Sequence, residues 1–181
     1  MKNTAKAFIY WLAAFLLWET VLHTAVFPDM SRFLPAVGFS AAAAALTAAL
    51  TGLPGRFGVK GVVSTLLAWA VPAGLFLFYA VQLVYHDIFA ALLSLAYVSQ
   101  GGAALAAFWP IALAAIWHCL PRLLLLALPL VGFAILRTCR VLEKTRHILA
   151  LVTASAAITA LMVLSLPLMG GTGANTPYAA Y

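Results

Sequence analysis

The stretch YAVQLVYHDIFAALLSLAYVSQGGAALAAFWP, residues 79–110, decides how the rest of the chain is arranged. It leaves an apolar run through a group of polar side chains and then continues for about twenty weakly amphipathic residues, interrupted by glycine and polar positions. The polar group consists of Gln82, Tyr85, His86 and Asp87. Such interruptions do not fit a clean membrane span. We therefore expect residues 86–118 to form a helical segment that lies along one membrane surface.

The composition excludes a soluble globular domain. Hydrophobic residues make up 66% of the chain and charged residues only 8%, with a mean hydropathy of +1.09, so the apolar surface needs lipid around it rather than water. The net charge of +6 does not indicate a nucleic-acid partner, because the basic residues fall in short clusters between apolar runs. The predicted fold class is an all-α polytopic membrane protein.

Five apolar runs are long enough, or nearly so, to cross the roughly 30 Å of hydrocarbon in a bilayer. The predicted spans are residues 7–27, 33–53, 62–84, 121–139 and 148–169, which make residues 1–169 a single transmembrane domain. The fourth span is placed after residue 120 because proline is tolerated in the first turn of a helix, and Pro121 stands there. Residues 170–181 contain the glycine, asparagine and proline that are typical of a linker.

The basic residues are unevenly distributed between the two predicted membrane faces. One face holds Lys2, Lys6, Arg56, Lys60, Arg137, Arg140, Lys144 and Arg146, whereas the other holds only Arg32 and Arg122. The positive-inside rule then predicts a cytoplasmic N-terminus, an extracellular C-terminus and extracellular residues 79–122. If residues 88–109 also crossed the bilayer, the loop at residues 137–146 would move outside and the asymmetry would vanish. This is the main reason for placing the segment on the surface.

Two ionisable residues share one face of the first span. Glu19 and His23 are four residues apart, so on a helix they can pair or bind a common partner. An ionisable residue inside a span is costly unless it is paired or faces water. The favoured interpretation is a hydrogen bond between helices, to Gln82, Arg122 or a backbone group; the alternative is a direct role in a lipid or proton site.

A second group of polar residues is predicted at the extracellular headgroup level. Tyr85, His86 and Asp87 stand where the third span ends, and Arg122 and Arg32 are predicted at the same depth. The arginines could pair with a lipid phosphate while the acid or histidine orients hydroxyl groups. The alternative, which is favoured, is ordinary anchoring by residues that prefer this depth.

No catalytic or metal motif is evident in the chain. It contains four acidic residues and lacks the HExxH, GxSxG and phosphate-loop patterns. His118 precedes Cys119, but without an orienting partner this pair indicates a buried, inert cysteine rather than a nucleophile. Cys119 and Cys139 are predicted near opposite faces, too far apart for a disulfide. We expect neither a catalytic residue nor a metal site in this chain.

Three pieces of the sequence resemble the membrane domain of the lipoteichoic acid synthase and phosphoglycerol transferase family. They are FLLWETVLHTAVF at residues 15–27, FLFYAVQLVYHDIF at residues 76–89 and LPRLLLLALPLVGFAIL at residues 120–136. The pieces WET and YAVQLVY are the most informative. The resemblance covers nearly the whole chain, in order and with similar spacing.

The resemblance implies five spans in the cell membrane of a Gram-positive bacterium, followed by an extracellular sulfatase-like domain. In that family a threonine nucleophile and a divalent metal, usually Mn²⁺, lie in the extracellular domain, which transfers glycerol phosphate from phosphatidylglycerol to a polymer. None of those catalytic motifs occurs here, and Tyr181 falls about where the linker to that domain would begin. The chain is then expected to anchor the catalytic domain and to present an anionic lipid such as phosphatidylglycerol to it.

Two other interpretations stay open. The chain could be a freestanding small membrane protein, such as a transporter subunit or a lipid-binding or assembly factor, although it has no internal repeat and few polar residues within its spans. Alternatively, the helices could serve only as an anchor, with no specific role for the extracellular segment.

Overall fold

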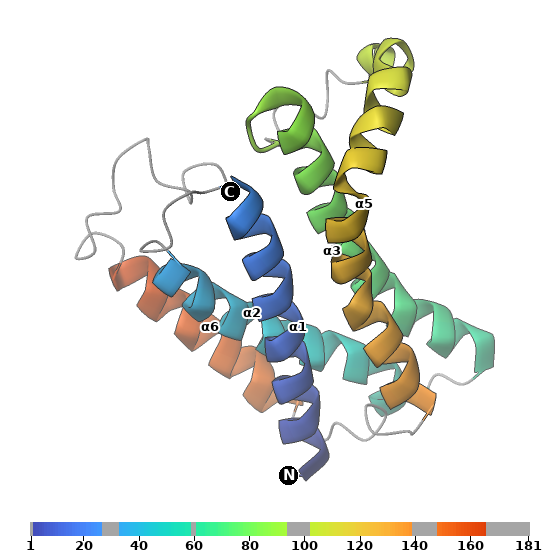
Figure 1. Cartoon of the computed structure of the whole chain (residues 1–181). Helices are drawn as coiled ribbons and strands as arrows, with labels where there is room; N and C mark the ends of the chain where they lie inside the picture. The colour runs from blue at the N-terminus through green and yellow to red at the C-terminus, as the bar shows by residue number, and fades with distance from the viewer. Residues whose placement is uncertain (1, 27–32, 59–60, 94–101, 139–147, 166–181) are drawn as a thin grey trace.

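The protein is all α-helical over the residues that the structure, a computed structural model, describes: 2–26, 33–58, 61–93, 102–138 and 148–165 (Figure 1). The helices are α1 (Lys2–Val26), α2 (Phe33–Arg56), α3 (Gly61–Phe89), α5 (Gly102–Thr138) and α6 (Ile148–Ser165). The predicted all-α class is confirmed. By length and composition, α1, α2, α3 and α5 each contain a stretch able to cross a membrane, whereas α6 contributes a shorter apolar helix.

The boundaries of the third and fourth predicted spans need correction. α3 continues to Phe89, five residues beyond the predicted end at residue 84, and α5 begins at Gly102 rather than near Pro121. Residues 86–89 and 102–118 therefore belong to two long helices, α3 and α5, and do not form one separate helical segment. Residues 94–101 between them, and the predicted linker at 170–181, lie outside the described residues.

The physical reason for this correction is that α5 accommodates prolines in its interior. Pro110, Pro121 and Pro129 all lie inside the helix. Each removes one backbone donor and leaves the carbonyl four residues earlier without its helical partner. In an apolar helix that packs against neighbours, other groups can satisfy the freed carbonyls, so the helix continues. Proline at residue 121 was therefore a wrong signal for a helix start.

The helices form two pairs with α1 between them (Figure 1). α3 and α5 run antiparallel, because contacts join the start of α3 to the end of α5 and the end of α3 to the middle of α5. α2 packs against α6, and α1 contacts α2, α3 and α5. The two pairs spread apart away from the region where α1 and α2 pack (Figure 1).

Small residues allow α2 to lie close to its neighbours. Ala44, Ala45, Ala48 and Ala49 are almost fully buried, as is typical of helices that approach each other closely inside a membrane. On the side toward α6, the hydroxyl of Ser155 donates a hydrogen bond of 2.8 Å to a backbone carbonyl of α2. α2 is thus the helix through which α6 is attached to the rest of the protein.

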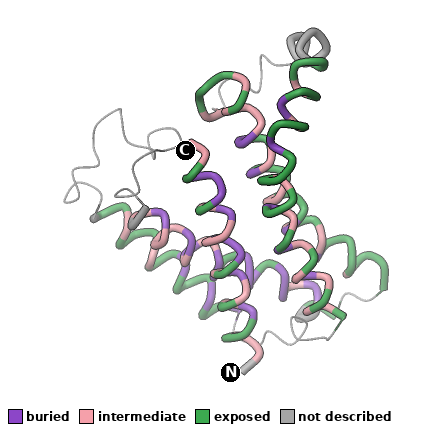
Figure 2. Tube along the Cα trace, in the orientation of Figure 1, coloured by how far each residue is buried: buried purple, intermediate pink, exposed green. Residues whose placement is uncertain are grey.

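Large apolar side chains cover the outer faces of α3, α5 and α6. The buried residues lie mostly on α1 and α2, whereas α3, α5 and α6 present exposed faces (Figure 2). These faces carry exposed side chains such as Leu66, Leu124, Val131, Leu149 and Leu164. An apolar surface of this extent is typical of proteins that insert into membranes.

Candidate functional site

The polar residues of α1 and α3 meet in the interior. The hydroxyl of Tyr79 donates a hydrogen bond of 2.6 Å to the Glu19 carboxylate. The Tyr79 ring also packs against Trp18, with centroids 5.4 Å apart. The expected hydrogen bond between helices at Glu19 is present, but its partner is Tyr79 and not Gln82, Arg122 or a backbone group. His23, one turn further along α1, is buried at 3% exposure.

Aromatic side chains continue this contact toward α5. The Trp18 indole donates a hydrogen bond of 2.8 Å to the backbone carbonyl of Leu126, and the Tyr10 hydroxyl donates to that of Pro129. Gly132 provides the space for Tyr10, because a Cβ there would lie 3.2 Å from the tyrosine ring. Polar atoms of α1 therefore reach the backbone of the proline-containing part of α5.

Gln82 holds the chain where α3 ends. Its amide nitrogen donates to the backbone carbonyl of Leu93 over 3.0 Å, and its amide oxygen accepts from the Leu93 N–H over 2.8 Å. Between them the chain reverses direction at Ala90, which has φ of 51°, a left-handed conformation often seen just after a helix. Gln82 therefore has a structural role that the sequence did not predict.

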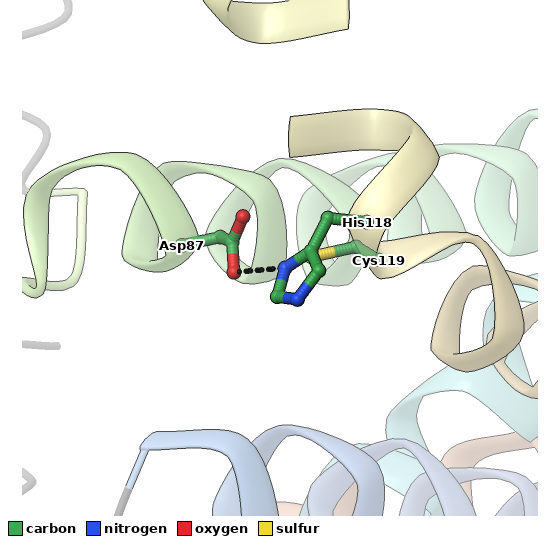
Figure 3. A group of neighbouring side chains, drawn as sticks. All are labelled: Asp87, His118 and Cys119. Atoms are coloured by element: carbon green, nitrogen blue, oxygen red, sulfur yellow. Dashed lines mark hydrogen bonds and ion pairs between the residues drawn. The ribbon is translucent and has the colours of Figure 1, made fainter. Parts of the chain in front are cut away.

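Asp87 lies in a second polar contact, between α3 and α5 (Figure 3). Its carboxylate is 2.8 Å from Nδ1 of His118. Cys119 follows His118 and is 1% exposed. One ligand-type atom from each of these three residues lies within 4.8 Å of those of the other two. We call this group the Asp–His–Cys cluster.

The other residues predicted at the headgroup level are divided between α3 and α5 in the described part of the chain. The Tyr85 ring packs against Phe89 with centroids 4.6 Å apart, and His86 is half-buried. Arg122 is exposed on α5, one turn beyond His118, and Arg32 lies outside the described residues. Of the residues predicted at the headgroup level, Asp87 is thus the one that contacts α5, at His118. Arg122 lies one turn further along the same helix.

His118 and Cys119 are the residues that sequence reasoning missed. The sequence predicts a buried, inert Cys119 because it shows no orienting partner for the pair; the burial is confirmed, since Cys119 is 1% exposed. Asp87 provides that partner, from a helix 31 positions earlier in the chain. The sequence does contain a pair of adjacent ligand-type residues in an otherwise apolar helix. This pair indicates a site only once the pairing of α3 with α5 is known, because Asp87 comes from α3.

Comparisons with protein-family models, curated proteins and solved structures find no match.

Proposed function

We propose that this chain is an integral membrane domain that presents a group of polar residues at the outer headgroup level. The distance along the helices between two polar contacts of α3 with α5 supports this proposal. At one end Arg137 donates to the Thr65 hydroxyl over 3.1 Å, and at the other His118 pairs with Asp87. Arg137 follows His118 by 19 residues, about 29 Å at about 1.5 Å per residue. That length equals about one hydrocarbon thickness.

The same spacing accounts for the length of α5. Its 37 residues extend for about 55 Å, far more than the roughly 30 Å of hydrocarbon. The excess lies before His118, where Trp109 and Trp117 are exposed. Tryptophan favours the membrane interface. In this proposal the first turns of α5 lie in the outer headgroup region, and the rest of the same helix crosses the membrane.

Charge sidedness gives the proposed orientation. Arg137, at one end of the α3–α5 pair, belongs to the basic cluster that continues to residue 146. The positive-inside rule assigns that end to the cytoplasm. The Asp–His–Cys cluster and Arg122 then face the extracellular leaflet, with the N-terminus inside and the C-terminus outside.

Contact between two informative sequence pieces supports a more specific proposal. WET contributes Trp18 and Glu19, and YAVQLVY contributes Tyr79, to the contacts in the interior. We propose on this basis a membrane domain similar to that of lipoteichoic acid synthases. It would hold an extracellular, Mn²⁺-dependent phosphoglycerol transferase domain beside its phosphatidylglycerol-type substrate in a bacterial cell membrane.

The Asp–His–Cys cluster favours a second candidate. A freestanding membrane protein, such as a lipid-binding or assembly factor or a transporter subunit, needs a ligand site of its own, and this cluster offers ligand-type atoms in close proximity. The mass of the native protein in its host membrane, measured by immunoblot, distinguishes the two. A band far above 19.2 kDa supports the transferase, whereas a band at that mass supports the freestanding protein.

Lipid selectivity tests the function that both candidates share. We would measure binding of fluorescent phosphatidylglycerol and phosphatidylcholine to the protein in detergent. Arg122→Gln should reduce the preference for phosphatidylglycerol, because the arginine charge is proposed to pair with phosphate. Arg137→Gln is the matched control, since it removes the same charge from the other end of α5. Equal binding of the two lipids, or equal effects of the two substitutions, would overturn the headgroup proposal.

A further inference from the structure

The Asp–His–Cys cluster combines three different ligand types on two helices. Asp87 comes from the last turn of α3, while His118 and Cys119 are neighbours on α5 (Figure 3). The carboxylate and imidazole already meet at 2.8 Å, which fixes the relative position of the two helices at this point. No change in the fold is needed to bring the three groups together.

The spacing of the ligand atoms is close to that of a tetrahedral metal site. Bonds of about 2.0–2.3 Å from zinc to nitrogen, oxygen and sulfur place neighbouring ligand atoms about 3.3–3.7 Å apart. The three groups lie within 4.8 Å of one another. The Asp87–His118 contact at 2.8 Å must lengthen by about 0.6 Å, and the thiol, within 4.8 Å of the other two atoms, must approach by up to about 1 Å to reach this spacing. Side-chain rotation is sufficient for such movements.

The charges of the cluster also match a divalent cation. A carboxylate and a thiolate together carry two negative charges, and neutral imidazole adds none, so the occupied site is electrically neutral. Neutrality favours binding at the boundary of an apolar medium, where an uncompensated charge is costly. On binding, the metal takes the lone pairs of Sγ, an imidazole nitrogen and a carboxylate oxygen, and the thiol proton passes to solvent.

The ligand set indicates which metal the cluster selects. A thiolate with an imidazole suits Zn²⁺ better than Mg²⁺ or Ca²⁺, which prefer sites made of oxygen atoms. Cys119 is buried, whereas Asp87 and His118 are exposed. The sulfur is therefore shielded from water. The exposed side of the cluster leaves the fourth coordination position of the metal to water or another small ligand, as in zinc sites with three protein ligands.

The geometry points to a zinc-binding site formed by Asp87, His118 and Cys119, at the end of the α3–α5 pair that the proposed orientation places outside the cell. The site would join the two helices where they reach the headgroup region. All three proposed ligands belong to this chain.

Co²⁺ binding tests the proposal, because Co²⁺ replaces Zn²⁺ and its bond to a thiolate gives a charge-transfer absorption. The full chain would be purified in detergent without a polyhistidine tag and titrated with Co²⁺ and then Zn²⁺. We expect one Co²⁺ per chain, a thiolate charge-transfer band and its loss when Zn²⁺ displaces Co²⁺. No band, or a band that Zn²⁺ leaves unchanged, would overturn the proposal.

Matched substitutions assign the signal to the cluster. Cys119→Ser should abolish the band, and Asp87→Asn and His118→Gln should each weaken binding by at least about tenfold. Cys139→Ser and His147→Gln, which remove the same residue types but keep Asp87, His118 and Cys119, should leave binding unchanged. A band that survives in Cys119→Ser, or disappears in Cys139→Ser, contradicts the assignment.

Alkylation of the cysteine provides a second readout that does not depend on a variant of the cluster. In the Cys139→Ser background, bound Zn²⁺ should slow the reaction of Cys119 with a maleimide by at least about tenfold, since the thiolate is then a ligand. Far-UV circular dichroism confirms that the protein stays folded. Equal alkylation rates with Zn²⁺ and with a chelator would mean that the three residues form only a hydrogen-bonded contact.

Discussion

Removal of the Tyr79 hydroxyl should destabilise the protein through its effect on Glu19. Tyr79→Phe keeps the ring beside Trp18 and removes only the donor of the 2.6 Å hydrogen bond to the carboxylate. Hydrogen bonds between helices in membranes contribute about 0.6 kcal/mol on average and up to about 1.7 kcal/mol. Because this bond is short and its acceptor is a carboxylate, we expect a loss near the upper value, about 1.5 kcal/mol.

A double-mutant cycle isolates the contribution of this hydrogen bond. Unfolding of Tyr79→Phe, Glu19→Leu and the double variant would be followed by far-UV circular dichroism in mixed micelles with rising dodecyl sulfate. The coupling energy between the two positions should be about 1 kcal/mol. Tyr85→Phe is the control, and it should change the free energy of unfolding by less than about 0.5 kcal/mol. A coupling energy near zero, or equal effects of the two tyrosine substitutions, would mean that the Tyr79–Glu19 hydrogen bond does not stabilise the protein.

Two further predictions concern the chain reversal after α3 and the packing of α5. Gln82→Leu removes both hydrogen bonds to Leu93. Their loss costs about 1–2 kcal/mol locally, so hydrogen exchange of the Leu93 amide should become about tenfold faster. An unchanged exchange rate would contradict this. Gly132→Val forces a side chain against Tyr10 and should destabilise the protein by about 1–3 kcal/mol, whereas Gly74→Val, where a Cβ meets nothing within 4 Å, should have a smaller effect.

Hydrophobic length predicted the position of α2 to within a few residues, although Pro54 lies inside that helix. The predicted second span, residues 33–53, begins at the first residue of α2 and ends three residues before it does. α5 was misjudged because Pro121 fits both a helix start and a proline tolerated within an apolar helix. The local sequence does not distinguish these two cases. What distinguishes them is the packing of α1 against α5, where the Trp18 indole donates to the Leu126 carbonyl, and this contact joins distant parts of the chain.

The candidate site was less predictable because its contacts join distant segments. Helical spacing correctly indicated that Glu19 needs a partner, but Tyr79 is 60 positions away. Likewise, nothing near His118 in the sequence points to Asp87. The turn at Ala90 has no signal of its own, since alanine rarely adopts a positive φ. It occurs where the Gln82 amide pairs with the backbone of Leu93.

The Asp–His–Cys cluster and Arg137 are proposed to lie at opposite faces of a membrane. Single cysteines placed by Arg122→Cys and by Arg137→Cys, in a Cys119→Ser and Cys139→Ser background, would be labelled in intact cells with a membrane-impermeant maleimide. We expect labelling of position 122 from outside, and labelling of position 137 only after the membrane is permeabilised. Labelling of both positions from the same side would contradict it.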